Sequence, residues 1–289
     1  MNTDYLCENK LKERNSELHK RFRESVFGIQ GLLNRYKYIF PTYTDHTALH
    51  SLEVIDFCNA LIGQEQIDRM NDDEIYILLM SAYLHDSGMG IAMSDYEEFR
   101  ENIDFGDYYD DGQEREMPDI IRDFHHEFSG QFIRKYGVFF DIPSKEHLYC
   151  IIQVSRGHRK TDLYDEKEYP VDYRLSNGNQ ICLPYLAALI RLADELDIAA
   201  DRNIQFLYDI SEIDNDFSRM EFKEHKAIGS LVIEPERFVM KVDTSDQNVF
   251  EGVLELREKL RETLSECRRV TAERTGYTIS QEDIVIVPV

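Results

Sequence analysis

For about 200 residues the chain carries apolar side chains at helical spacing, and the pattern then changes. Between residues 45 and 62, apolar residues recur about every three positions, which indicates a helix with one buried face. A Thr44 or Asp45 N-cap suits its start, since short polar side chains accept hydrogen bonds from the first free N–H groups. Residues 5–40 read as one or two helices, and another helix is expected to start after residues 71–73 and to end near residues 87–90. Further helical signals cover residues 118–136, 144–157 and 183–198.

The C-terminal part has a different texture, rich in β-branched and aromatic residues. The sequence Glu234–Arg237 has the character of a hairpin turn. Strands are expected at 204–210, 230–234, 238–242 and 284–287, and one long amphipathic helix is expected at 247–273. We therefore predict a mainly α protein. An all-α bundle over residues 1–203 precedes a smaller α+β extension over residues 204–289.

Two stretches between the helices are predicted to be loops. Residues 101–116 crowd acidic side chains with few aliphatic ones, which favours a solvated, mobile loop. A lid over a functional site is the alternative for this stretch. Residues 162–180 are polar and are also expected to form a long loop.

The net charge of the chain limits the classes of molecule that it can bind. Lys and Arg number 33 against 56 Asp and Glu, which gives a net charge of −23. Such a surface repels long nucleic acids and anionic lipid, and it favours bound cations, small ligands and protein partners. The longest apolar run, residues 75–84, is half of what a bilayer requires. We therefore expect no membrane association.

Cysteine content and the N-terminus bear on the compartment. The five cysteines are widely spaced and form no C-x-x-C pair, so neither a zinc ribbon nor a disulfide framework is indicated. The N-terminal residues lack the basic and apolar regions of a signal peptide. A reduced, cytoplasmic setting is the expectation.

Each of several predicted helices contributes one or two histidine or aspartate residues that could bind a metal ion. The dipeptide His85-Asp86 closes a helix that reads as buried, and a lone pair of this kind arises easily by chance. Its companions make it informative, because each neighbouring helix contributes a further imidazole or carboxylate. In chain order the set is His50, His85, Asp86, His125, His158 and Asp194.

These motifs resemble a known family. Residues 46–54, 83–88 and 192–197 look like the three signature segments of the HD-domain superfamily of metal-dependent phosphohydrolases. The stretches around His125 and His158 resemble the extra histidines of its two-metal members. The resemblance spans about residues 40–203, and it implies an all-α fold, a central metal site, and hydrolysis of phosphoester or phosphoanhydride bonds.

The ligand set implied by the resemblance agrees with coordination chemistry. Imidazole and carboxylate suit Mn, Fe, Co, Ni or Zn, and Mg is a further option. Only a carboxylate has two oxygens to bridge two cations, so Asp86 is the expected bridge. His50, His85 and Asp194 would complete one metal, and His125 and His158 the other. Two such cations share a hydroxide and clamp a phosphoryl oxygen.

Other residues near these motifs are candidates for the substrate. Arg156, Arg159 and Lys160 flank His158 and form a positive patch suited to phosphate, although a solvated helix end explains them equally well. His126 is the alternative ligand or a substrate contact, and His46 is a catalytic or supporting group one turn before His50.

The chain departs from the family pattern in one respect. Many HD enzymes have a lysine shortly after the His-Asp pair, whereas residues 87–91 here read Ser-Gly-Met-Gly-Ile. Arg159 or another cation must therefore supply that phosphate contact.

Together these observations predict a two-metal phosphohydrolase acting on a nucleotide or a related small phosphorylated compound. A di-iron oxygenase shares the same ligand order, and a non-catalytic nucleotide-sensing module is a third hypothesis. The α+β extension would suit regulation or assembly into a homo-oligomer.

Overall fold

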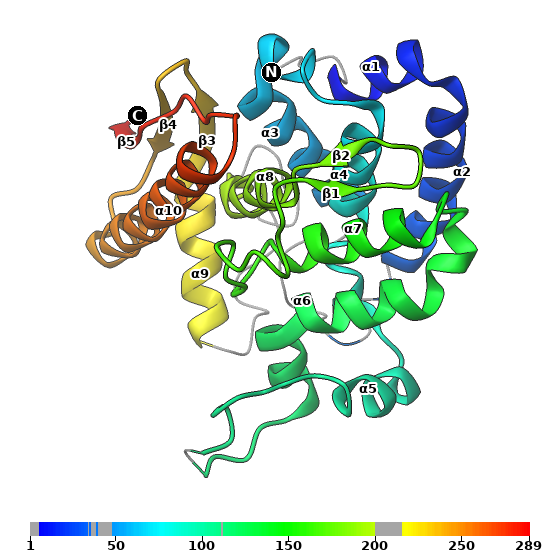
Figure 1. Ribbon diagram of the computed structural model, residues 1–289. Coiled ribbons are helices and arrows are strands. Elements are labelled where there is room, and N and C mark those ends of the chain that lie inside the picture. Colours follow the sequence, from blue (N-terminus) through cyan, green and yellow to red (C-terminus); the bar gives the residue numbers. More distant parts are fainter. Residues whose placement is uncertain (1–5, 34, 36–38, 40–47, 111, 200–215) are drawn as a thin grey trace.

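Helices make up most of the protein, and a small sheet lies near its C-terminus (Figure 1). The computed structural model describes residues 6–33, 35, 39, 48–110, 112–199 and 216–289. The mainly α class with a small C-terminal α+β part is confirmed. In chain order the elements are α1 (Leu6–Arg14), α2 (Ser16–Leu33), α3 (Ala48–Ile67), α4 (Asp72–Leu84), η2 (Ser87–Gly90), α5 (Met93–Arg100), α6 (Met117–Tyr136), η3 (Gly137–Phe140), α7 (Lys145–Arg156), β1 (Tyr173–Arg174), β2 (Gln180–Ile181), α8 (Leu183–Leu196), α9 (Asp216–Ala227), β3 (Ile228–Ile233), β4 (Arg237–Val242), α10 (Gln247–Arg274) and β5 (Asp283–Pro288).

Helix α4 forms the centre of the bundle. Its start is fixed by a capping box, in which Asn71 accepts from the Glu74 N–H and Glu74 accepts from the Asn71 N–H. Every residue from Asp73 to Leu84 is buried, because α1, α2, α3, α7 and α8 all pack against this helix. The end of α4 is thus held deep inside the protein. None of the described helices is long and apolar enough to cross a membrane.

Glycine at position 88 allows η2 to lie directly against α6. A Cβ atom on Gly88 would be 2.5 Å from the carbonyl oxygen of His125 and 2.6 Å from the Ser129 nitrogen. The Gly88 N–H donates to the Ser129 Oγ at 2.8 Å, which ties the two elements together. This close approach brings the chain after α4 next to the middle of α6.

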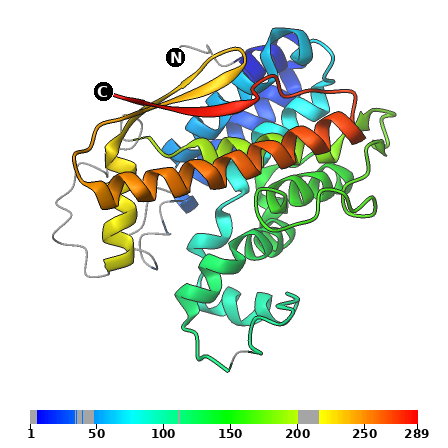
Figure 2. The same ribbon diagram turned by 90° about the vertical axis from the view of Figure 1, so that its left-hand side faces the viewer.

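The C-terminal sheet has β4 in its middle. Strand β4 pairs antiparallel with β3 and parallel with β5, and the turn between β3 and β4 falls where it was predicted. Helix α10 runs along α8 (Figure 2). Lys259 of α10 binds Glu195 of α8 at 2.9 Å. The extension therefore packs directly on the helix that carries Asp194.

Several expectations from the sequence need correction, and others concern residues that the structure does not describe. The described acidic residues of the 101–116 segment are exposed, but Phe105 and Tyr108 pack on Phe124, and Tyr108 donates to Asp123. The segment is thus anchored by aromatic contacts that the prediction of a purely solvated loop did not include. Helices α5 and α9 were not predicted. The proposed N-cap at residues 44–45, the strand at 204–210 and the domain boundary at 203 lie outside the described residues.

We expect Gly88→Ala to lower the free energy of unfolding by about 1–3 kcal/mol, because the added methyl group must displace the backbone of α6. The matched control is Gly28→Ala in α2, where a new Cβ meets no atom within 4 Å. That control should be neutral or should stabilise by up to about 1 kcal/mol, since alanine favours helix. Urea denaturation measures both values. Equal stability of the two variants would contradict the close packing at Gly88.

Candidate metal centre

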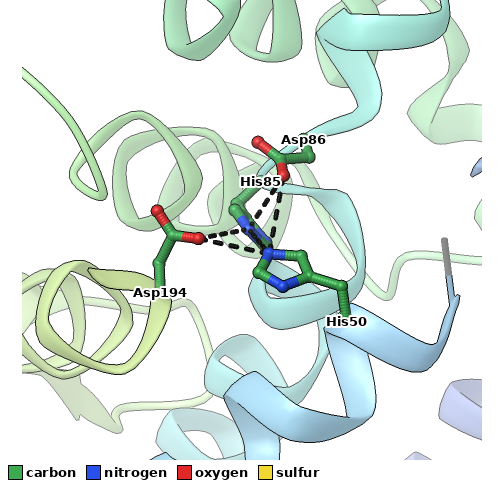
Figure 3. Close-up of side chains that lie close together, drawn as sticks. All are labelled: His50, His85, Asp86 and Asp194. Atoms are coloured by element: carbon green, nitrogen blue, oxygen red, sulfur yellow. Dashed lines mark hydrogen bonds and ion pairs between the residues drawn. The ribbon is translucent and has the colours of Figure 1, made fainter. Parts of the chain in front are cut away.

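All six side chains of the predicted ligand set converge at the centre of the bundle. The donor atoms form two groups that share Asp86, and within each group all of them lie within 4.8 Å of one another. Figure 3 shows the first group, in which Asp86 and Asp194 approach His50 and His85 from two sides. The two groups are His50, His85, Asp86 and Asp194, and Asp86, His125 and His158.

Helix ends and one helix interruption aim these side chains at a common point. His85 and Asp86 follow α4 directly, and His158 follows α7, so neither segment is constrained by continuing helix. Within α6, Phe124 has non-helical angles (φ −122°, ψ 17°), and His125 comes immediately after it. His50 and Asp194 project from the regular helices α3 and α8.

The Asp86 carboxylate lies between two pairs of imidazole nitrogens. Its Oδ2 is 3.6 Å from His50 Nε2 and 3.4 Å from His85 Nε2. Its Oδ1 is 3.4 Å from His125 Nε2 and 3.6 Å from His158 Nε2. Each oxygen therefore faces one pair, which is the arrangement that a bridging carboxylate requires.

Hydrogen bonds at the far side of each ring fix which nitrogen faces inward. The Nδ1 atoms of His85, His125 and His158 contact the backbone carbonyls three residues earlier, at 3.0, 2.7 and 2.6 Å. A carbonyl oxygen only accepts, so each Nδ1 must carry the proton. In the neutral rings the Nε2 lone pairs are then directed into the cluster.

The Nε2 atoms lie too close to one another for neutral rings alone. His125 and His158 are 2.8 Å apart at these atoms, and His50 and His85 are 3.2 Å apart. Two lone pairs facing each other at this distance need a proton or a cation between them. Two donors that each lie about 2.1 Å from one ion are about 3 Å apart at a right angle, so the spacing fits metal binding. The residues present therefore fit divalent transition metals.

Electrostatics favour a cation in this cluster. Burial raises the pKa of the Asp194 carboxyl, but hydrogen bonds with His50 and His85 outweigh it and hold the pKa well below 3.8. Burial lowers the pKa of His85, yet Asp86 and Asp194 raise it to about 9. Burial and the neighbouring imidazoles keep the pKa of His158 well below 6.5. The carboxylate is thus charged and His158 is a neutral donor at neutral pH.

Asp197 lies behind the cluster and orients His50. Its Oδ2 is 2.7 Å from His50 Nδ1, which holds the proton there and turns Nε2 toward Asp86 and Asp194. Supporting carboxylates of this kind commonly fix a ligating histidine.

The three basic residues that are predicted to bind the substrate differ in their surroundings. The Arg156 guanidinium donates to both carboxylate oxygens of Glu127, at 3.0 and 2.6 Å, and it also contacts Glu168. The Arg159 side chain has no ion-pair partner within the described part of the chain, and Lys160 is exposed near the Phe124 ring. Arg159 and Lys160 are consequently better placed than Arg156 to meet an anion.

His126 is buried beside the centre but does not join either ligand group. Its Nδ1 has no hydrogen-bond partner among the described residues, and its ring packs near those of His125 and His158. Burial first, and nearby positive charges second, lower the pKa of His126 to about 2, so the ring is neutral. His46, the other predicted catalytic histidine, lies outside the described residues.

Arg191 of α8 is a site residue that the sequence analysis did not single out. It is buried, and its guanidinium donates to the carbonyls of Gly157, Arg159 and Thr161 at 2.7–2.8 Å. These bonds fix the loop that carries His158. It also binds Glu266 of α10 at 2.7 Å. In the sequence, Arg191 is the one charged residue within the apolar stretch 183–193, and this position could have indicated a buried cation with a specific role.

The fold and the site together define an HD-domain-like protein, and the comparison with protein families agrees. The sequence model of the family HD-CE matches residues 40–270. Because this match covers well over half of the chain, the chain belongs to the HD-CE family. Comparison with curated proteins and with solved structures gave no match.

We expect Arg191→Lys to lower the free energy of unfolding by about 2–4 kcal/mol, because an ammonium group cannot reach the same carbonyls as the planar guanidinium. The control is Glu266→Gln, which removes the partly exposed ion pair and leaves the three loop bonds in place; it should cost less than about 1 kcal/mol. Chemical denaturation with and without added Mn²⁺ gives both values. If Arg191→Lys were as stable as Glu266→Gln, the loop would not depend on Arg191.

Proposed function

We propose that the protein is a metal-dependent phosphohydrolase with two divalent ions per chain, acting on a nucleotide or a related small phosphorylated compound. The observation that carries this proposal is the Asp86 carboxylate, with one oxygen facing each pair of imidazole nitrogens. Membership of the HD-CE family and the buried His/Asp cluster support HD-type metal-dependent hydrolysis. Bound divalent ions would supply a hydroxide nucleophile at neutral pH and positive charge at the phosphoryl oxygens.

Each predicted site residue has a specific role in this proposal. His50, His85 and Asp194 would hold one ion, His125 and His158 the other, and Asp86 both. Arg159 and Lys160 would bind the phosphate, since no described carboxylate occupies either cation. The proposal keeps Arg156 and His126 as neighbours of the substrate, and it keeps His46 as a catalytic or supporting group.

The two-part organisation is part of the proposal as well. Residues 1–203 would form the metal-binding domain, and residues 204–289 would form an extension that packs on it through α10. Contacts of α10 with α8, including those of Glu266 with Arg191 and Lys259 with Glu195, support this role of the extension. The surface of such an extension is also where a homo-oligomer would assemble.

A screen for phosphate release tests the activity. Purified protein is supplied in turn with Mn, Fe, Co, Ni, Mg and Zn and with a panel of nucleotides, cyclic nucleotides and simple phosphoesters. We expect metal-dependent release of phosphate or of a nucleoside monophosphate, and about two ions per chain by elemental analysis. Dioxygen consumption without hydrolysis would instead support the oxygenase. Binding of nucleotides without turnover would support the sensing module.

Asp86→Asn serves as the test variant in the same screen. It should lose turnover and retain fewer than one ion per chain, because one carboxylate serves both ions. The matched control is Asp73→Asn, since Asp73 is also a buried aspartate bound to a histidine, His147, at 2.8 Å. Asp73→Asn should keep both ions. Full metal content and activity in Asp86→Asn would refute the proposed bridge.

Arg159→Ala separates substrate binding from metal binding. Loss of a charge-assisted contact with the phosphate should cost about 2–3 kcal/mol, which lowers kcat/KM roughly 30- to 150-fold. Metal content and thermal stability should stay at wild-type values, because the side chain has no ion-pair partner among the described residues. Arg174→Ala, an exposed cation on β1, is the control and should change neither value. Unfolding of Arg159→Ala would show that the cation is structural.

A further inference from the structure

An apolar cavity extends from Asp86 toward α2, η3 and α5. Its volume is about 320 Å³, at the lower end of the range of about 300–1,000 Å³ usual for small-molecule pockets. Asp86 and Ser87 line one end of the cavity. The rest of its wall is mainly aliphatic and aromatic, with Leu33, Leu84, Ile91, Phe132 and Phe140 among the lining residues.

Among the polar side chains in this wall, Ser87 and Asp95 are occupied by other contacts, and Arg35 is exposed to solvent. Ser87 donates its hydroxyl hydrogen to the Leu84 carbonyl at 2.7 Å. Asp95 accepts from the Tyr136 hydroxyl at 2.8 Å and from Lys135 at 2.9 Å. A nucleobase placed here would give up hydrogen bonds to water and gain few in return, which is costly for buried polar groups. The wall therefore suits a hydrocarbon surface.

We propose that this cavity binds an apolar substituent of the substrate, either an alkyl chain or an unsubstituted aromatic ring. The inference rests on the proposed phosphohydrolase function and narrows its substrate class. Asp86 belongs both to the metal centre and to the cavity wall, so a substrate whose phosphate meets the centre can extend its substituent into the cavity. Burial of that hydrocarbon would contribute affinity in proportion to the apolar area removed from water.

The reaction on such a substrate is a simple hydrolysis. The bond between phosphorus and the oxygen of the substituent breaks, and a new bond forms between phosphorus and the oxygen of water. One proton of that water passes to the leaving oxygen. The products are an alcohol or phenol and inorganic phosphate, and no oxidant or reductant takes part.

Calorimetry with three probes tests the cavity: inorganic phosphate, 1-naphthylphosphonate, whose P–C bond the proposed reaction does not cleave, and 1-naphthol. The test variant is Ala92→Phe, because Ala92 lines the cavity and a phenyl ring would fill it. The matched control is Met93→Phe, which adds a ring at the next position, where the side chain is 58% exposed and outside the cavity lining. Urea denaturation verifies that both variants fold, and Ala92→Leu replaces Ala92→Phe if the larger ring unfolds the protein.

Metal-loaded wild-type protein should bind 1-naphthylphosphonate at least about tenfold more tightly than inorganic phosphate. Ala92→Phe should remove this advantage and leave phosphate affinity unchanged, and Met93→Phe should behave as wild type. Equal affinity of the two anions for the wild type, or an advantage that survives in Ala92→Phe, would overturn the inference.

Binding of 1-naphthol distinguishes this inference from the proposed function, because it needs neither metal nor phosphate. Binding to the wild type that is lost in Ala92→Phe supports the cavity even if no phosphoester is hydrolysed, and that result would count against the hydrolase alone. Phosphate release without any naphthol binding would have the opposite meaning: the hydrolase would stand, and the apolar site would fall.

Discussion

The position of one buried carboxylate governs the arrangement of the whole centre. Asp86 directs one oxygen to His50 and His85 and the other to His125 and His158. Burying a charge and several imidazoles together is expensive unless each finds a partner. The fold offsets this cost by bringing five segments to one point, where carboxylate oxygens and imidazole nitrogens face each other. A divalent cation shared by these donors would complete the compensation.

Placement of that carboxylate depends on packing at the level of single atoms. Gly88 lets η2 touch α6, so Asp86 comes within 3.4 Å of His125 Nε2. Backbone carbonyls near the ends of α4 and α7 hold the Nδ1 protons of His85 and His158. Asp197 and Arg191 then fix His50 and the loop around His158. The supporting contacts thus come from the helix framework itself.

Much of the fold was predictable because helical burial leaves a periodic trace in the sequence. Helices α4, α6, α7, α8 and α10 begin and end within a few residues of their predicted limits, as do strands β3, β4 and β5. Helix α5 is short, and α9 is rich in charged residues with few apolar ones, so both lack a clear period. Such elements form because neighbouring parts of the chain pack against them, and a local pattern does not record those neighbours.

By itself, the sequence determined the types and order of the six donor residues and the elements on which they lie. It determined these because donor chemistry and helical period are local properties of the chain. Only the tertiary structure decided that Glu127 binds Arg156, that Arg191 fixes the His158 loop, and that a cavity adjoins Asp86. These features join residues tens of positions apart, and their geometry depends on how the helices pack together.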